Sequence, residues 1–133
     1  MAKSILSLPI LCLLLLLSFN SGGLLKLANG QTISCFKQGK TWCVAKPSSN
    51  DTALVSSINF ACSQLGTLGF SCNLIQENGI CYYPNTIINH ASVVMNNYYQ
   101  AFGRHIWDCD FGASALITVS DPSYGSCLYP SVL

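Results

Sequence analysis

The sequence predicts an α+β fold, in which two main helices pack on a short antiparallel sheet and disulfide bonds hold the small domain together. Three observations lead to this prediction. Two segments carry apolar residues at helical spacing, a later region is rich in β-branched and aromatic residues, and cysteines are spread along the whole stretch. About 100 residues follow an N-terminal leader, which is enough for one domain with a modest core.

The chain begins like a secretory signal peptide. A start that holds one lysine precedes an apolar run over residues 10–19, which is shorter than the roughly 20 residues of a membrane-spanning helix. Ala28 and Gly30 offer signal peptidase the small residues that it accepts, so we expect residues 1–30 to be removed. A cut nearer Gly22 is the alternative.

Charge and the last residues of the chain exclude two classes of partner. Beyond residue 30 there are four basic and five acidic residues, a net charge of −1, whereas nucleic-acid-binding domains carry clusters of Lys and Arg. The chain stops at YPSVL without an apolar tail, so we expect neither a transmembrane segment nor a lipid anchor. A freely secreted, extracellular protein is the prediction.

The cysteines beyond the leader are Cys35, Cys43, Cys62, Cys72, Cys81, Cys109 and Cys127. In a small secreted chain this density predicts a disulfide framework of three bridges with one odd thiol. Cys35 is the expected odd one, either capped or paired between two chains of an otherwise monomeric protein. A zinc site is disfavoured because there is no Cys-x2-Cys pair, and we expect no metal and no cofactor.

Residues 46–65, KPSSNDTALVSSINFACSQL, predict the first helix. Ser49, Asn50 or Asp51 can cap its N-terminus, and Cys62 would tie its end to the rest of the domain. The apolar residues at helical spacing are Leu54, Ile58, Ala61 and Leu65. Asn50 also begins an N-glycosylation sequon, which the start of a surface helix would keep exposed.

The second helix is expected over PNTIINHASVVMNNYYQAFG, residues 84–103, after a looped segment with three glycines. Asn85 or Thr86 is its expected N-cap, and Gly103 its stop. A stripe at steps of three and four residues is expected to face the core: Ile88, Ala91, Met95, Tyr98 and Phe102. Tyr99 would then lie one step around the helix, toward solvent.

Short strands are expected beyond the second helix. β-Branched and aromatic residues are frequent in HIWDCDF, residues 105–111, and in SALITVS, residues 114–120. In the second of these strands, Ala115, Ile117 and Val119 would share one face. SDPSYGSC then indicates a turn.

Asp108 and Asp110 are the one carboxylate pair that could act on a glycosidic bond. On a strand the two would share a face at roughly 6 to 7 Å, which is within the spacings that glycoside hydrolases use. Aspartates beside a bridged cysteine are more often solvated or backbone-capping residues. His90 and His105 have no adjacent nucleophile motif. We therefore predict no catalytic residue and keep the aspartate pair as an alternative.

Aromatic and amide side chains crowd the segment NNYYQAFGRHIWDCDFG, residues 96–112. A pyranose ring packs its C–H face on an aromatic plane, and planar amides bind its hydroxyl groups. We predict a surface for neutral sugars made by Tyr99, Asn96, Gln100, Trp107 and Tyr124. Trp107 and Tyr124 are equally consistent with a packing role in the core or in a turn.

Several ordered motifs resemble one known family. TWCVAKP, INFAC, CYYPNTIINHASVVMNNYYQAFGRHIWDCDF and DPSYGSC are similar to the plant carbohydrate-binding modules of family 43, also called X8 domains. The likeness covers a domain over residues 41–129, between a short segment (31–40) and a tail (130–133). Family members occur at the C-terminus of plant endo-1,3-β-glucanases and related pollen allergens, and alone in plasmodesmata callose-binding proteins.

The resemblance implies binding of β-1,3-glucan, or callose, in the plant cell wall or apoplast, without hydrolysis. It also implies how six cysteines pair: Cys43 with Cys109, Cys62 with Cys127, and Cys72 with Cys81. The segment between Cys62 and Cys72 is longer than is usual in the family.

Two other functional hypotheses stay open. A small lipid carrier would also be secreted, helical and rich in cysteine, but such carriers have a Cys-Cys dipeptide and a Cys-x-Cys motif, and this sequence has neither. A minimal glycoside hydrolase that uses Asp108 and Asp110 is the other.

Overall fold

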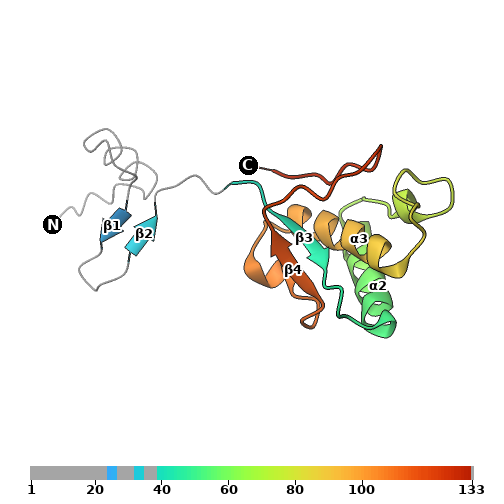
Figure 1. Ribbon diagram of the computed structural model, residues 1–133, viewed down its shortest axis with the longest axis horizontal. Helices are drawn as coiled ribbons and strands as arrows, with labels where there is room; N and C mark the ends of the chain where they lie inside the picture. Colours follow the sequence, from blue (N-terminus) through green and yellow to red (C-terminus); the bar gives the residue numbers. More distant parts are fainter. Residues whose placement is uncertain (1–23, 27–31, 35–38, 133) are drawn as a thin grey trace. The chain divides into compact units, whose positions relative to one another are not determined.

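The computed structural model describes three stretches of the chain: residues 24–26, 32–34 and 39–132. The chain forms two compact units, and the second, which begins at Gly39, contains the two long helices found among the described residues (Figure 1). Within these stretches every helix is too short or too polar to span a bilayer.

In the first unit, the described residues form one pair of strands. β1 (Leu24–Lys26) and β2 (Thr32–Ser34) run antiparallel, with Leu25 opposite Ile33. The expected signal-peptide cut after Gly30 and the expected odd thiol of Cys35 lie outside the described residues, so both stay predictions.

The first predicted helix is present as α2 (Asp51–Thr67). Asn50, one of the three expected caps, takes the N-cap position, and its side-chain oxygen accepts a hydrogen bond from the amide of Ala53 at 2.8 Å. Asn50 is exposed, so the glycosylation sequon lies at the surface, and its occupancy stays a prediction. The buried face of the helix consists of Leu54, Ser57, Ala61 and Leu65.

The second predicted helix is α3 (Ile87–Ala101). Thr86 caps it by accepting a hydrogen bond from the amide of Asn89 at 3.2 Å. Gly103 has a φ of 106°, in the left-handed region that favours glycine, and the chain leaves the helix there. α3 contacts both α2 and the sheet, and it lies between them in Figure 1.

The sheet pairs β3 (Trp42–Ala45) with the antiparallel β4 (Ala115–Thr118), so that Cys43 lies opposite Ile117. With the two helices, this sheet confirms the predicted α+β fold class. β4 is one of the expected strands, whereas β3 is not. The prediction that Val119 shares a strand face with Ala115 is wrong, because Val119 lies beyond the end of β4 and is 79% exposed.

The other expected strand, over residues 105–111, is wrong. The chain instead forms a 3-10 helix, η2 (Ile106–Cys109), at whose start a carboxylate oxygen of Asp108 accepts a hydrogen bond from the amide of His105 at 3.0 Å. Phe111 then has a φ of 49°, which an extended strand does not allow. Local capping therefore outweighs the β-propensity of this segment.

Three disulfide bonds are described, joining Cys43 to Cys109, Cys62 to Cys72, and Cys81 to Cys127. The first bond agrees with the pairing that the resemblance implies. The expected pairing of the other four cysteines, Cys62 with Cys127 and Cys72 with Cys81, is wrong. The chain after α2 folds back, because the amide of Phe70 donates to the carbonyl of Leu65 at 3.1 Å. This turn, which leads into η1 (Asn73–Ile75), brings Cys72 to the end of α2 and not to Cys81.

The buried face of α3 differs from the predicted stripe in its last turn. Ala91 and Met95 are fully buried as predicted, but Tyr98 and Phe102 are only partly buried, and Tyr99 is fully buried. Two buried clusters meet on this helix. One includes Val93 and Val94 with Trp42, Ala61, Ile75, Cys81, Cys127 and Tyr129; the other includes Ala91, Met95 and Tyr99 with Cys43, Ala45, Leu54, Cys109 and Ala115.

Candidate functional site

An open groove of about 530 Å³ lies between α2 and the segment formed by η2 and the turn after it. Its aromatic lining consists of Phe60, Tyr98, Trp107 and Phe111. The rest of its lining consists of Ala53, Ser56, Ser57, Asp108, Gly112 and Ser114. We call it the aromatic groove.

Three of the rings in the aromatic groove contact one another. The ring centroid of Phe60 lies 5.5 Å from that of Tyr98 and 6.3 Å from that of Phe111, and the latter two are 5.4 Å apart. Phe102 stacks on Tyr98 at 4.3 Å. The separations among Phe60, Tyr98 and Phe111 are in the range that aromatic pairs prefer. The rings thus hold each other in place, while Phe60 is still 50% exposed.

The polar groups of the aromatic groove are mostly hydroxyls. Ser56 is exposed, whereas the hydroxyl of Ser57 donates to the carbonyl of Ala53 at 2.8 Å. Asp108 contributes the one carboxylate, and none of the lining residues is a cation. A neutral ligand rich in hydroxyls suits such a lining, because an anionic ligand would lose hydration without gaining a counter-charge.

The phenol of Tyr98 stays neutral in this environment. Burial raises the pKa of Tyr98 above its ordinary value of 10.0, and the negative charge of Asp108 raises this pKa further. At physiological pH the group is therefore a hydroxyl that can both donate and accept hydrogen bonds.

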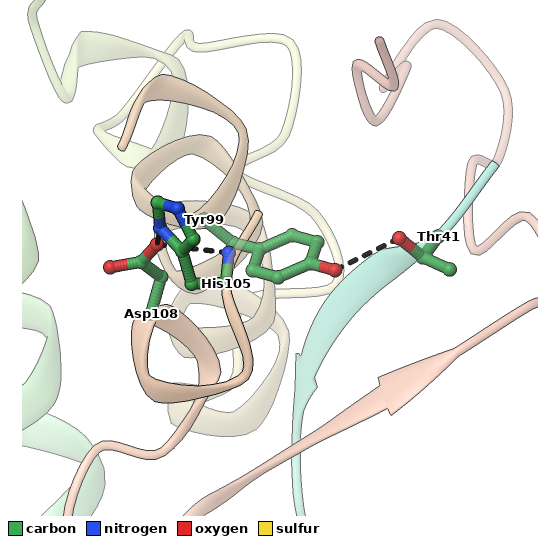
Figure 2. A network of polar contacts seen from close by, with 4 residues as sticks. All are labelled: Thr41, Tyr99, His105 and Asp108. Atoms are coloured by element: carbon green, nitrogen blue, oxygen red, sulfur yellow. Dashed lines mark hydrogen bonds and ion pairs between the residues drawn. The ribbon is translucent and has the colours of Figure 1, made fainter. Parts of the chain in front are cut away.

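Two predicted binding residues face the core instead of solvent. Tyr99 is fully buried, and its hydroxyl oxygen lies 2.9 Å from that of Thr41, just before β3 (Figure 2). Asn96 is also fully buried; its side-chain oxygen accepts from the amide of Cys43 at 3.1 Å, and its nitrogen donates to the carbonyl of Pro130 at 2.9 Å. The prediction that both are exposed is wrong, because β3 covers this side of α3.

The other three predicted residues lie in different places. The side-chain nitrogen of Gln100 donates to the carbonyl of Thr41 at 2.8 Å, and the hydroxyl of Tyr124 donates to the carbonyl of Tyr83 at 2.8 Å. Trp107 is 73% exposed and lines the aromatic groove. The groove thus contains one of the five predicted residues. A role in ligand binding for Gln100, Tyr124 and Trp107 stays a prediction.

Sequence reasoning missed three residues of the aromatic groove: Phe60, Tyr98 and Phe111. The apolar periodicity assigns Tyr98 to the core stripe. A signal for Phe60 does exist, because Ala53 and Ser56 precede it at helical spacing and mark a face of α2 with little side-chain bulk.

The aspartate pair does not have the geometry on which the hydrolase hypothesis depends. Asp108 lies in η2 and is 6% exposed, whereas Asp110 follows the helix and is exposed. A carboxylate oxygen of Asp108 lies 2.7 Å from the ring Nδ1 of His105 and also accepts the amide of that residue (Figure 2). The predicted shared strand face is absent here, and Asp108 is already hydrogen-bonded.

Comparison with known proteins places these residues in a family. The model of a family described as the X8 domain matches residues 41–116. The major pollen allergen Ole e 10 of Olea europaea is 49% identical over 92 residues, which are 69% of this chain and 72% of the allergen.

Two further relatives are longer than this chain. A glucan endo-1,3-beta-D-glucosidase of Olea europaea is 47% identical over 95 residues, which are 71% of this chain and 20% of the enzyme. Plasmodesmata callose-binding protein 5 of Arabidopsis thaliana is 40% identical over 94 residues, which are 71% of this chain and 51% of that protein. The chain therefore spans a fifth of the first relative and about half of the second.

Proposed function

The chain belongs to the X8 domain family, and we propose on this basis that it is a carbohydrate-binding protein that holds β-1,3-glucan without hydrolysing it. The names of two relatives support this ligand, since one acts on a 1,3-β-glucan and the other binds callose, which is a β-1,3-glucan. The alignment with each of these relatives covers 71% of this chain.

The aromatic groove is the observation that carries the proposal. Its exposed rings, Phe60 and Trp107, offer flat apolar surfaces to the C–H faces of glucose units. Ser56 and the phenol of Tyr98 offer hydroxyl groups to the sugar hydroxyls. A glucan is neutral, so the near absence of charge in the groove avoids a desolvation cost on binding.

We also propose that the protein is secreted and acts in the plant cell wall, including the wall around plasmodesmata. The signal-peptide pattern over residues 1–30 supports export, and the three disulfide bonds suit an oxidising compartment. Callose is a wall polymer, so the ligand and the location agree.

Affinity electrophoresis in gels with a soluble β-1,3-glucan tests the proposal. We expect the full secreted protein to be retarded and the Phe60→Ala variant to lose affinity by about tenfold, because one stacking surface is removed. Phe70→Ala is the matched control: Phe70 has a similar exposure, 58%, but lies outside the aromatic groove.

The same incubation separates binding from hydrolysis. We expect no new reducing ends in the glucan after incubation with the wild-type protein. Release of reducing ends that stops in an Asp108→Asn variant would support the hydrolase hypothesis, and equal retardation of the Phe60→Ala and wild-type proteins would remove the groove from the proposal.

A further inference from the structure

Trp107 is exposed, but one face of its indole is occupied. The ring stacks on the imidazole of His105, with centroids 4.4 Å apart and planes 5° apart. An exposed indole on a single turn of 3-10 helix would otherwise sample several rotamers. The stack therefore favours one orientation for a ring that lines the aromatic groove.

The imidazole of His105 is itself held in place. Its Nδ1 lies 2.7 Å from a carboxylate oxygen of Asp108, and the backbone amide of His105 donates to the same oxygen at 3.0 Å (Figure 2). Asp108 is 6% exposed whereas the side chain of His105 is 48% exposed, so the contact is sheltered on its carboxylate side and open to water on the imidazole side.

Glycine at position 103 is part of the same arrangement. A Cβ atom there would lie 2.8 Å from Cε1 and 3.3 Å from Nδ1 of the His105 ring. The ring thus rests against the Gly103 backbone at a distance that a larger residue would not allow. Backbone, carboxylate and indole together leave the imidazole little freedom.

We propose that His105 is a positioning residue that orients Trp107 as a preset stacking platform for a glucose unit at the mouth of the aromatic groove. The proposal rests on the proposed function. Asp108 and Gly103 hold the imidazole, the imidazole supports one face of the indole, and the sugar packs on the other face.

Preorientation affects affinity because ordering a mobile side chain opposes binding. A platform that is already ordered avoids this cost, which for one side chain corresponds to roughly three- to tenfold in affinity. Loss of the stack should therefore weaken glucan binding by that factor while Trp107 itself is still present.

Two substitutions at the same position separate stacking from a merely structural role. His105→Phe keeps an aromatic plane under the indole and loses the contact with Asp108, whereas His105→Asn keeps a polar group near Asp108 and loses the plane. We expect His105→Phe to bind a soluble β-1,3-gluco-oligosaccharide within about twofold of wild type, and His105→Asn to bind roughly three- to tenfold more weakly. Thermal unfolding of both variants checks that they are folded.

Tryptophan fluorescence gives a readout that does not depend on binding. Trp42 is 5% exposed and serves as a buried reference, so acrylamide quenching and fast anisotropy decay report mainly on Trp107. In the absence of sugar we expect faster local motion and stronger quenching in His105→Asn than in wild type, and recovery of the wild-type values in His105→Phe.

The outcomes distinguish the two proposals. If wild type does not bind the oligosaccharide, the proposed function fails and the platform role fails with it. If wild type binds but Trp107→Ala binds equally well, or His105→Asn matches wild type in affinity and in anisotropy, the positioning role is overturned while glucan binding stands.

Discussion

Tyr98 and Tyr99 are neighbours in the chain with the same side chain, and α3 gives them opposite environments. Consecutive residues of a helix point roughly 100° apart. Tyr99 therefore packs against the segment that enters β3 and is fully buried, whereas Tyr98 contacts Phe60 and Phe111 in the aromatic groove. The partner that covers each side of the helix, and not the residue type, decides whether a tyrosine belongs to the core or to a candidate binding surface.

The two sides also differ in how completely their polar groups are used. On the β3 side, Asn96 bonds the amide of Cys43 and the carbonyl of Pro130, and the hydroxyl of Tyr99 meets that of Thr41. On the groove side, Tyr98 lines the open groove together with Ser56, which is exposed. Substitutions on the β3 side should therefore act on stability, and those on the groove side on binding.

Tyr99→Ala should have the largest effect on stability. It removes a fully buried ring from the cluster around Met95, and we expect the free energy of unfolding to fall by about 3 to 5 kcal/mol. Urea denaturation of the oxidised protein measures it. Tyr99→Phe is the control, which should lose only the contact with Thr41, about 1 kcal/mol. A wild-type midpoint for Tyr99→Ala would contradict the core assignment.

Asn96→Ala should cost less, about 2 kcal/mol, because it leaves the buried amide of Cys43 and the carbonyl of Pro130 without their side-chain partner. The neighbouring Asn97 is half-buried, and Asn97→Ala should be close to neutral. Denaturation midpoints of the two variants give the comparison. Equal midpoints would mean that Asn96 does not tether β3 to the helix.

Tyr98→Ala should change binding more than stability. We expect affinity for a β-1,3-gluco-oligosaccharide to fall by about 1 kcal/mol, or fivefold, as measured by titration calorimetry. Its unfolding free energy should fall by less than that of Tyr99→Ala, because Tyr98 is only partly buried. If Tyr98→Ala destabilises the protein as much as Tyr99→Ala does, the contrast between the two sides of α3 is lost.

Local patterns were sufficient to predict both helices. The N-caps at Asn50 and Thr86 and the glycine stop at Gly103 follow from residue chemistry within one turn. The position of Tyr99 does not. A stripe drawn at steps of three and four assumes that one side of the helix is covered, but α3 is covered by α2 on one side and by β3 on another. Its buried arc is therefore wider than the periodicity predicts.

The strand expected over residues 105–111 is wrong for a local reason, the capping of η2 by Asp108. The other errors concern contacts between segments and not patterns within one element. β3 has only four residues, and its partners in β4, from Ala115 opposite Ala45 to Thr118 opposite Trp42, lie seventy or more positions further along the chain. Cysteine spacing alone leaves about fifteen pairings for six residues, and the turn that joins Cys62 to Cys72 depends on how α2 ends. The aromatic groove has the same origin, because Phe60 and Trp107 come from elements that meet only in the folded chain.

The smallest predicted effect is that of the Asp108 charge on the pKa of Tyr98, on the groove side of α3. Burial, and to a lesser degree the carboxylate of Asp108, raise the pKa of Tyr98 above 10.0. Because the folded pKa is the higher one, the associated stability is complete below the unfolded pKa and is lost as the pH rises through the folded pKa.

The tyrosinate absorbance of wild type minus that of Tyr98→Phe isolates this titration. Asp108→Asn, compared in the same way with Asp108→Asn/Tyr98→Phe, should lower the pKa of Tyr98 only part of the way to its ordinary value, since burial persists. An unchanged titration would show that Asp108 is electrically remote from Tyr98, and a complete return would show that charge, not burial, dominates this side of the helix.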